Sequence, residues 1–189
     1  MPQEGDVLVY DEAIHASVHE GMKGSRVKGR GCKVAFRHND VEDLERVLLE
    51  LVGGRSRGSS TSSGSSSSSS SSNGGIDGME NNNSNEENDS NRIRTGKRNV
   101  FVAVEAVYSM DGDVANLLEI VELIEKLLPM GNGYVIVDEA HATGVIGPQG
   151  RGLVCELRLE NRVFARLHTF GKALACSGGQ YSCPGDTSF

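Results

Sequence analysis

The chain has 189 residues and a formal net charge of −7 at pH 7, without a Lys/Arg-rich stripe, which argues against a nucleic-acid binder. Its apolar runs are far shorter than the roughly 20 residues that span a bilayer, and no signal-peptide pattern opens it. The four cysteines lack CxxC spacing, which argues against a zinc site or a disulfide framework. We therefore expect a reduced, intracellular, cytoplasmic protein that holds no metal, with a mitochondrial or peroxisomal location left open.

The first fifty residues alternate between strand and helix patterns. Strands are expected over 6–10 (DVLVY) and 33–37 (KVAFR), with a helix over 12–22 between them. A second helix follows, with Asn39 or Asp40 as its N-cap. Its apolar residues recur at helical spacing: Val41, Leu44, Val47, Leu48 and Leu51.

A stretch of serine, glycine, asparagine and glutamate interrupts this pattern after the second helix. Such a segment cannot bury enough apolar surface to offset the entropy lost on ordering, so we expect it to be disordered. It divides one domain into two parts and gives the following boundaries: 1–54 as the first part, 55–97 as the insert, 98–180 as the second part and 181–189 as a divergent tail.

Beyond the insert the alternation resumes. The valine-rich run 99–105 (NVFVAVE) predicts a strand covered on both faces. A helix is expected from Asp113, as its cap, to Leu128, and further strands over 134–138 (YVIVD) and 162–170 (RVFARLHTF). This order predicts an α/β fold with a mostly parallel sheet and helices on both faces.

Polar clusters follow the last three strands, and each cluster begins or ends at an ionisable residue that could act in catalysis. EAVYSMDGD starts at Glu105, DEAHATGVIGPQGRG starts at Asp138, and HTFGK ends at Lys172. If the strands are adjacent and parallel, the three clusters converge at the carboxyl ends, where ligands bind in such sheets.

The second cluster has a competing interpretation. VIVDEAH resembles the acidic motif of helicase-type ATPases, in which an aspartate serves Mg²⁺ and a glutamate orients water. That function also needs a GxxxxGK[ST] loop to cradle the phosphates, and this chain contains none. We therefore expect no ATP hydrolysis.

A pyridoxal 5'-phosphate enzyme needs an amine, a carboxylate and donors for the phosphate and the ring hydroxyl, and Lys172, Asp138, Thr169 and His141 are residues of those types. VEAVYSMDGD, VDEAHATGVIGPQGRG and TFGKALACSGG resemble signatures of the α-oxoamine synthase family of fold-type I pyridoxal phosphate enzymes. DEAIHASVHEGMKGSR and FRHNDVEDLERVL resemble the same family in the same order.

The resemblance implies a role for each matching residue. Lys172 is implied to be the Schiff-base lysine, Asp138 to pair with the pyridinium nitrogen, His141 to reach the ring hydroxyl, and His15 to stack on the ring. Two hydroxyl residues are implied to lie near the ring and the phosphate respectively: Ser109 and Thr169. Without the resemblance, each of these residues has an ordinary alternative in a turn, a cap or a solvated surface.

The resemblance implies a transferase that condenses an amino acid with an acyl-CoA thioester and is a homodimer in its full-length form. The upstream phosphate-binding turn and the small C-terminal domain have no counterpart here, so we expect part of the large domain, with weak or no cofactor binding by the isolated chain. The alternative is a catalytically inactive, truncated relative that acts as a binding or regulatory subunit.

Overall fold

The computed structural model describes residues 2–29, 31–53 and 83–184 and is built on one six-stranded sheet. The strands lie in the order β2-β1-β3-β4-β5-β6; the first five pair in parallel and β6 is antiparallel to β5. The predicted mostly parallel α/β sheet is thus confirmed. The strands are β1 (Val7–Asp11), β2 (Lys33–Phe36), β3 (Val100–Glu105), β4 (Gly133–Asp138), β5 (Ala165–Thr169) and β6 (Gly179–Ser182).

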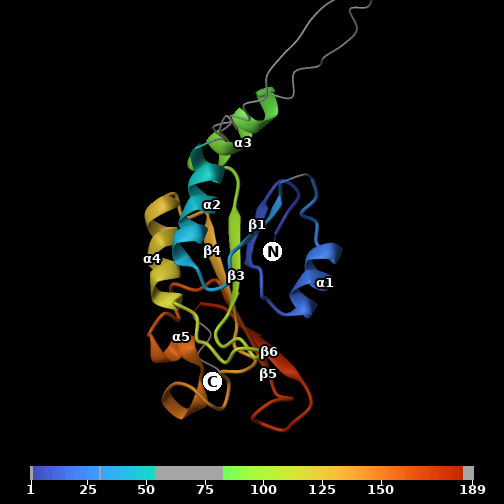
Figure 1. Cartoon of the computed structure of the whole chain (residues 1–189), viewed down its shortest axis with the longest axis vertical. Coiled ribbons are helices and arrows are strands. Elements are labelled where there is room, and N and C mark those ends of the chain that lie inside the picture. Colours follow the sequence, from blue (N-terminus) through green and yellow to red (C-terminus); the bar gives the residue numbers. More distant parts are fainter. Residues whose placement is uncertain (1, 30, 54–82, 185–189) are drawn as a thin grey trace, which may run out of the picture.

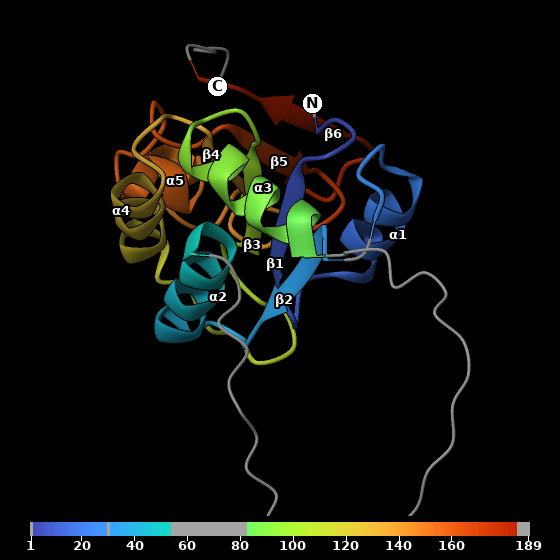
Figure 2. The same ribbon diagram turned by 90° about the horizontal axis from the view of Figure 1, so that it is seen from above.

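Helices cover both faces of this sheet, as expected (Figure 1). α2, α4 and α5 lie on one face and α1 on the other, and Figure 2 shows the same two layers from above. No helix of the described ranges is long and apolar enough to cross a membrane. The helices are α1 (Ala16–Gly24), α2 (Val41–Gly53), α3 (Asn83–Arg94), α4 (Leu117–Leu127), α5 (Leu153–Glu156) and the short 3-10 helix η1 (Pro148–Gly150).

Strand β3 shows why the valine-rich runs become central strands. Successive side chains of a strand point to opposite faces. Val100 and Val102 therefore enter the large core under α2 and α4, whereas Phe101 enters a smaller cluster on the face that carries α1. In that smaller cluster Phe101 stacks on Tyr134, with the two ring centroids 5.0 Å apart. Both faces of the strand are buried, which the apolar run predicted.

Helix α4 begins later than the sequence suggests. We expected Asp113 to cap it, but Asn116 is the N-cap and makes no side-chain capping hydrogen bond. The carboxylate of Asp113 instead contacts His38 and accepts a hydrogen bond from the side chain of Asn39. A tertiary contact therefore takes the place of the expected cap.

Part of the predicted insert is ordered. Residues 54–82 lie outside the described residues, but Asn83–Arg94 form α3, where the sequence predicted no regular structure. Ile93 on this helix is buried, and its carbonyl accepts a hydrogen bond of 2.8 Å from the Asn132 side chain. Asp89 pairs with the buried Arg98 at 2.8 Å. These tertiary contacts outweigh the poor apolar content of the segment; the boundaries of the insert stay a prediction.

Helix α2 provides a test of local capping. The Asp40 carboxylate accepts a 2.8 Å hydrogen bond from the N–H of Asp43, as expected of an N-cap residue. We expect Asp40→Ala to lower the free energy of unfolding by about 1 kcal/mol, the usual value of such a cap. Glu42→Ala, at an exposed position in the first turn, is the matched control. Equal denaturation midpoints for the two variants would contradict the assignment.

Candidate active site

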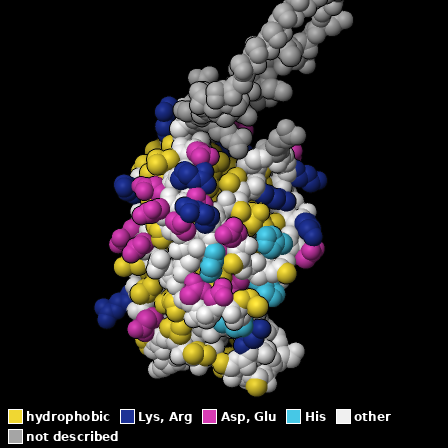
Figure 3. Space-filling view, viewed as in Figure 1, with side chains coloured by type: hydrophobic (Ala, Val, Ile, Leu, Met, Phe, Trp, Pro, Cys, Tyr) yellow, Lys and Arg dark blue, Asp and Glu magenta, His cyan; other side chains and the backbone are white. Residues whose placement is uncertain are grey.

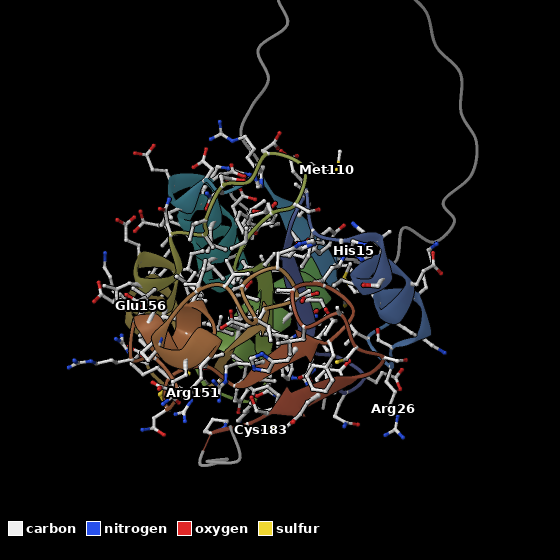
Figure 4. The ribbon with its side chains drawn as sticks, turned by 90° about the horizontal axis from the view of Figure 1, so that it is seen from below. His15, Arg26, Met110, Arg151, Glu156 and Cys183 are labelled. Carbon is white, nitrogen blue, oxygen red and sulfur yellow. The ribbon has the colours of Figure 1, made fainter. Side chains whose placement is uncertain are left out.

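The carboxyl ends of the parallel strands converge as predicted. Glu105 at the end of β3 lies directly opposite Asp138 at the end of β4, and Asp138 lies opposite Leu167 of the neighbouring β5. Lys172 follows the end of β5 by three residues. Figure 4 looks onto this end of the molecule. Figure 3, in the orientation of Figure 1, shows histidine side chains next to acidic side chains on the surface of the molecule.

Asp138 is the centre of the site. Its side chain is 9% exposed, and Oδ1 accepts a 2.9 Å hydrogen bond from the N–H of Ala140. Burial raises the pKa of Asp138, while this hydrogen bond and the charges of His15, His141 and Lys172 oppose that rise. The structure therefore brings these four predicted residues within electrostatic reach of one another.

His141 occupies the turn that follows β4. Burial lowers its pKa, and the positive charge of Lys172 lowers it further, whereas Asp138 raises it. The net effect favours the neutral imidazole. A neutral ring carries one N–H donor and one acceptor nitrogen, which suits a hydrogen bond to a hydroxyl group.

His15 is held by a carboxylate from another strand. It is the N-cap of α1, where its Nδ1 accepts a 3.2 Å hydrogen bond from the N–H of Ser17. Its own backbone N–H donates to Oε1 of Glu105 at 2.6 Å. Burial raises the pKa of Glu105, and the hydrogen bond from His15 opposes that rise. Glu105, whose role the motif alone did not give, fixes the backbone position of His15.

The remaining predicted residues differ in their surroundings. Thr169 Oγ1 is buried and has no hydrogen-bond partner among the described residues. Ser109 is exposed in the turn after β3, and no described contact joins it to the cluster around Asp138. Lys172 is exposed in a loop closed by a 2.9 Å hydrogen bond from the N–H of Phe170 to the carbonyl of Gly178. The charge of Lys172 thus acts on Asp138, while no such link is described for Ser109.

Glu139 has a structural role that the sequence did not reveal. Its carboxylate is fully buried and accepts 2.9 Å hydrogen bonds from the N–H groups of Leu153 and Val154 at the start of α5. Gly152 has φ +98°, and a Cβ there would meet Glu139 Oε2 at 2.5 Å. The glutamate of DEAH therefore closes the glycine-rich loop rather than orienting water, which removes the basis of the ATPase interpretation.

A second buried pair joins the turn after β4 to β5. Thr143 Oγ1 donates a 2.7 Å hydrogen bond to the carbonyl of Glu139 and lies 2.8 Å from Nδ1 of His168. Because the hydroxyl proton is already used, Nδ1 must carry the proton in this contact. Burial and the neighbouring charge of Arg166 lower the pKa of His168 to about 4, so the ring is neutral at pH 7. This contact fixes β5 immediately before Thr169.

These features define a class of protein: an α/β enzyme domain with a lysine, a buried carboxylate and two histidines beyond the carboxyl ends of its parallel strands. The comparison with protein families is specific. Residues 2–184 match the model of the aminotransferase class I and II family, and the chain belongs to that family. The family resemblance that the five motifs indicated is thereby confirmed.

Individual relatives give the same picture. The chain is 46% identical over 187 residues to the 8-amino-7-oxononanoate synthase of Emericella nidulans, covering 99% of this chain and 36% of that protein. It is 42% identical over 179 residues to the aminoacyl transferase sphA of Aspergillus fumigatus, covering 94% and 30%. The chain spans about a third of the length of the curated relatives that it matches.

Solved structures share the fold. A serine palmitoyltransferase from S. paucimobilis, solved with bound PLP and myriocin, aligns with a TM-score of 0.66 and 26% identity. The alignment covers 98% of this chain and 34% of that protein. The serine palmitoyltransferase of Sphingomonas wittichii aligns equally well, with a TM-score of 0.66.

Proposed function

We propose that this chain supplies cofactor-binding residues of a pyridoxal phosphate-dependent acyltransferase that condenses an amino acid with an acyl-CoA thioester. The observation that carries the proposal is that the charges of Lys172, His15 and His141 all act on the buried carboxylate of Asp138. The similarity to an 8-amino-7-oxononanoate synthase and to serine palmitoyltransferases, one of them solved with PLP, supports it.

The residues present fit pyridoxal phosphate by their chemistry. The cofactor has a ring nitrogen that can carry a positive charge, an aldehyde and a phosphate group. Asp138 offers a carboxylate for the nitrogen and Lys172 an amine for the aldehyde. The buried hydroxyl of Thr169 lacks a partner among the described residues, and an unsatisfied buried polar group is unfavourable. A phosphate oxygen would provide the missing partner.

Each of these residues would have one task in the reaction. The bound cofactor supplies an electron sink for charge that develops at the α-carbon of the amino acid. Lys172 Nζ takes the proton from that carbon and returns it. Asp138 would stay ionised beside the positive ring nitrogen, because an opposite charge would counteract the effect of its burial. His141, in its neutral form, would donate to or accept from the ring hydroxyl, and His15 would contact the ring.

The proposal also covers the location and the oligomeric state of the protein. We expect an intracellular protein, because all four cysteines are free thiols, as is usual in reducing compartments. We also expect the form extended to the length of its relatives to be a homodimer.

Replacement of Asp138 tests the proposed function most directly. In a chain extended to the length of its relatives, we expect Asp138→Asn to retain the cofactor but to slow exchange of the amino acid's α-proton. The expected factor is on the order of 10- to 100-fold, the value of one hydrogen bond to a charged group. Proton NMR of the amino acid in D₂O measures this exchange.

The matched control is Asp40→Asn, because asparagine also caps helices well and Asp40 lies in the loop before α2. It should exchange the α-proton at the wild-type rate. Wild-type protein that binds the cofactor but shows no α-proton exchange would contradict the proposal and favour the inactive binding subunit instead.

A further inference from the structure

His38, in the loop between β2 and α2, faces carboxylates on both sides of its ring. Nδ1 lies 2.9 Å from Oδ1 of the fully buried Asp11. Nε2 lies 3.2 Å from Oδ2 of Asp113, an ion-pair contact rather than a well-aligned hydrogen bond. Only a protonated imidazole carries an N–H on both nitrogens. The geometry around His38 therefore suits the charged ring.

The 106–115 hairpin, which contains Asp113, is held together by its own backbone. Val107 and Val114 form an antiparallel bridge, and the N–H of Ala115 donates to the carbonyl of Ala106 at 3.1 Å. The N–H of Gly112 donates to the carbonyl of Tyr108 at 2.8 Å. The base of the hairpin is fixed to the sheet, because the N–H of Ala106 donates to the carbonyl of Asp138 at 2.8 Å and the buried Tyr108 hydroxyl accepts from the N–H of Glu105 at 3.3 Å. The internal hydrogen bonds join the outer turn to this base.

The tip of the hairpin carries Ser109 and Met110, both exposed, and Met110 is 90% exposed. Figure 4 shows Met110 projecting from the outer side of this end of the molecule, with His15 nearer its centre. Ser109 is the predicted site residue for which no contact with the cluster around Asp138 is described. Because Ser109 lies in the hairpin, a shift of the outer part of the hairpin would move it.

Asn39 also connects the outer part of the hairpin to the loop before α2. Its side-chain Nδ2 donates to Asp113 Oδ2 at 2.9 Å, and its Oδ1 accepts from the N–H of Asn116 at 3.2 Å. Its own backbone N–H donates to Oδ2 of Asp11 at 2.8 Å. Asn39 adopts a positive φ of 51°, a conformation that costs energy unless such contacts hold it. The 38–39 segment thus joins Asp11 on one side to the hairpin on the other.

We propose that protonated His38 is a positioning residue that fastens Asp113, on the outer part of the 106–115 hairpin, to the end of β1, and that loss of this proton loosens this outer part while Ala106 and Tyr108 stay fixed. The movement follows from the contacts of the chain itself. Its consequence for catalysis, through the placement of Ser109, rests on the proposed function.

The direction of the pH dependence follows from the surroundings of His38. Burial lowers its pKa, but the hydrogen bond to Asp11 and the negative charges of Asp11 and Asp113 outweigh burial and raise the pKa above the ordinary value of 6.5. A raised pKa in the folded state means that the stabilisation is complete below pH 6.5 and is lost as the pH rises through the folded value. Other charged or titratable groups close by are Glu12, Arg37, Asp40, Tyr108 and Asp111.

Amide hydrogen exchange between pH 6 and 8.5 tests this proposal in the 189-residue chain without any cofactor. After correction for the intrinsic rate, we expect exchange at Asn116 to become up to about fivefold faster at the higher pH, from the loss of the partly exposed ion pair between His38 and Asp113. The amides of Gly112, inside the hairpin, and Asn39, bonded to Asp11, should keep their protection. His38→Gln should show the fast Asn116 exchange already at pH 6.

The control is His19→Gln, since His19 on α1 packs against Tyr10 and lies outside this network. Should His38→Gln fail to fold, an NMR titration of the wild-type His38 ring remains decisive. A measured pKa of His38 at or below 6.5 would overturn the proposal. Exchange at Asn116 that changes with pH only as the intrinsic rate does would also overturn it. Faster exchange at Gly112 as well would mean local unfolding and would also overturn it. None of these readouts depends on pyridoxal phosphate, so the proposed function can fail independently.

Discussion

Lys172→Ala is expected to abolish covalent labelling by pyridoxal phosphate and borohydride in a chain extended to the length of its relatives. Lys172 is the lysine whose charge acts on both Asp138 and His141, and a primary amine is the group that bonds an aldehyde. The fold should survive, because Lys172 is exposed in a loop of small residues and contributes little packing. Peptide mapping after reduction measures the label, and circular dichroism checks the fold.

Lys126→Ala is the control for this result. Lys126 is 71% exposed on α4, where its Nζ lies 3.6 Å from Glu45. Its removal should leave the label in place. A pyridoxyl group found on any lysine other than Lys172 would overturn the assignment.

Glu139→Gln is expected to lower the free energy of unfolding by about 2–4 kcal/mol, because a buried acceptor of two hydrogen bonds loses one of them. The carboxylate accepts from both Leu153 and Val154, whereas an amide offers one oxygen and turns an N–H₂ group toward the other donor. Burial raises the pKa of Glu139, and these two hydrogen bonds oppose that rise. Urea denaturation of the described fold measures the loss.

Glu156→Gln removes a charge from the same helix without touching this arrangement. Glu156 is exposed, and Figure 4 shows its side chain directed away from the body of the molecule. We expect its stability to stay within about 0.5 kcal/mol of wild type. A similar small change in Glu139→Gln would show that the loop before α5 does not depend on the carboxylate.

The sequence predicted the features that depend on local pattern and parallel topology. The valine-rich run 99–105 gave a central strand because both of its faces are buried, and the next strand end brought Asp138 beside Glu105. Once β3, β4 and β5 are adjacent and parallel, Lys172 must emerge near Asp138. This convergence needed no knowledge of individual contacts.

Features that depend on distant partners were missed. Asp113 looks like a helix cap in the sequence, but its partners His38 and Asn39 lie more than seventy residues away along the chain. The hydrogen bond from His15 to Glu105 likewise joins positions ninety residues apart. Helix α3 depends on Arg98 and Asn132, neither of which is visible in its own composition. Such contacts leave no periodic signal.

The serine-rich insert separates α2 from α3, and the C-terminal end of α2 and the whole of α3 lie toward the end of the sheet opposite the strand ends near Asp138 and Lys172 (Figure 1). Changes in the length of the chain between these helices therefore fall far from the chemistry. The same position suits protein engineering: a fluorescent domain or an affinity handle spliced between α2 and α3 should report on the molecule without obstructing the end where substrates would enter.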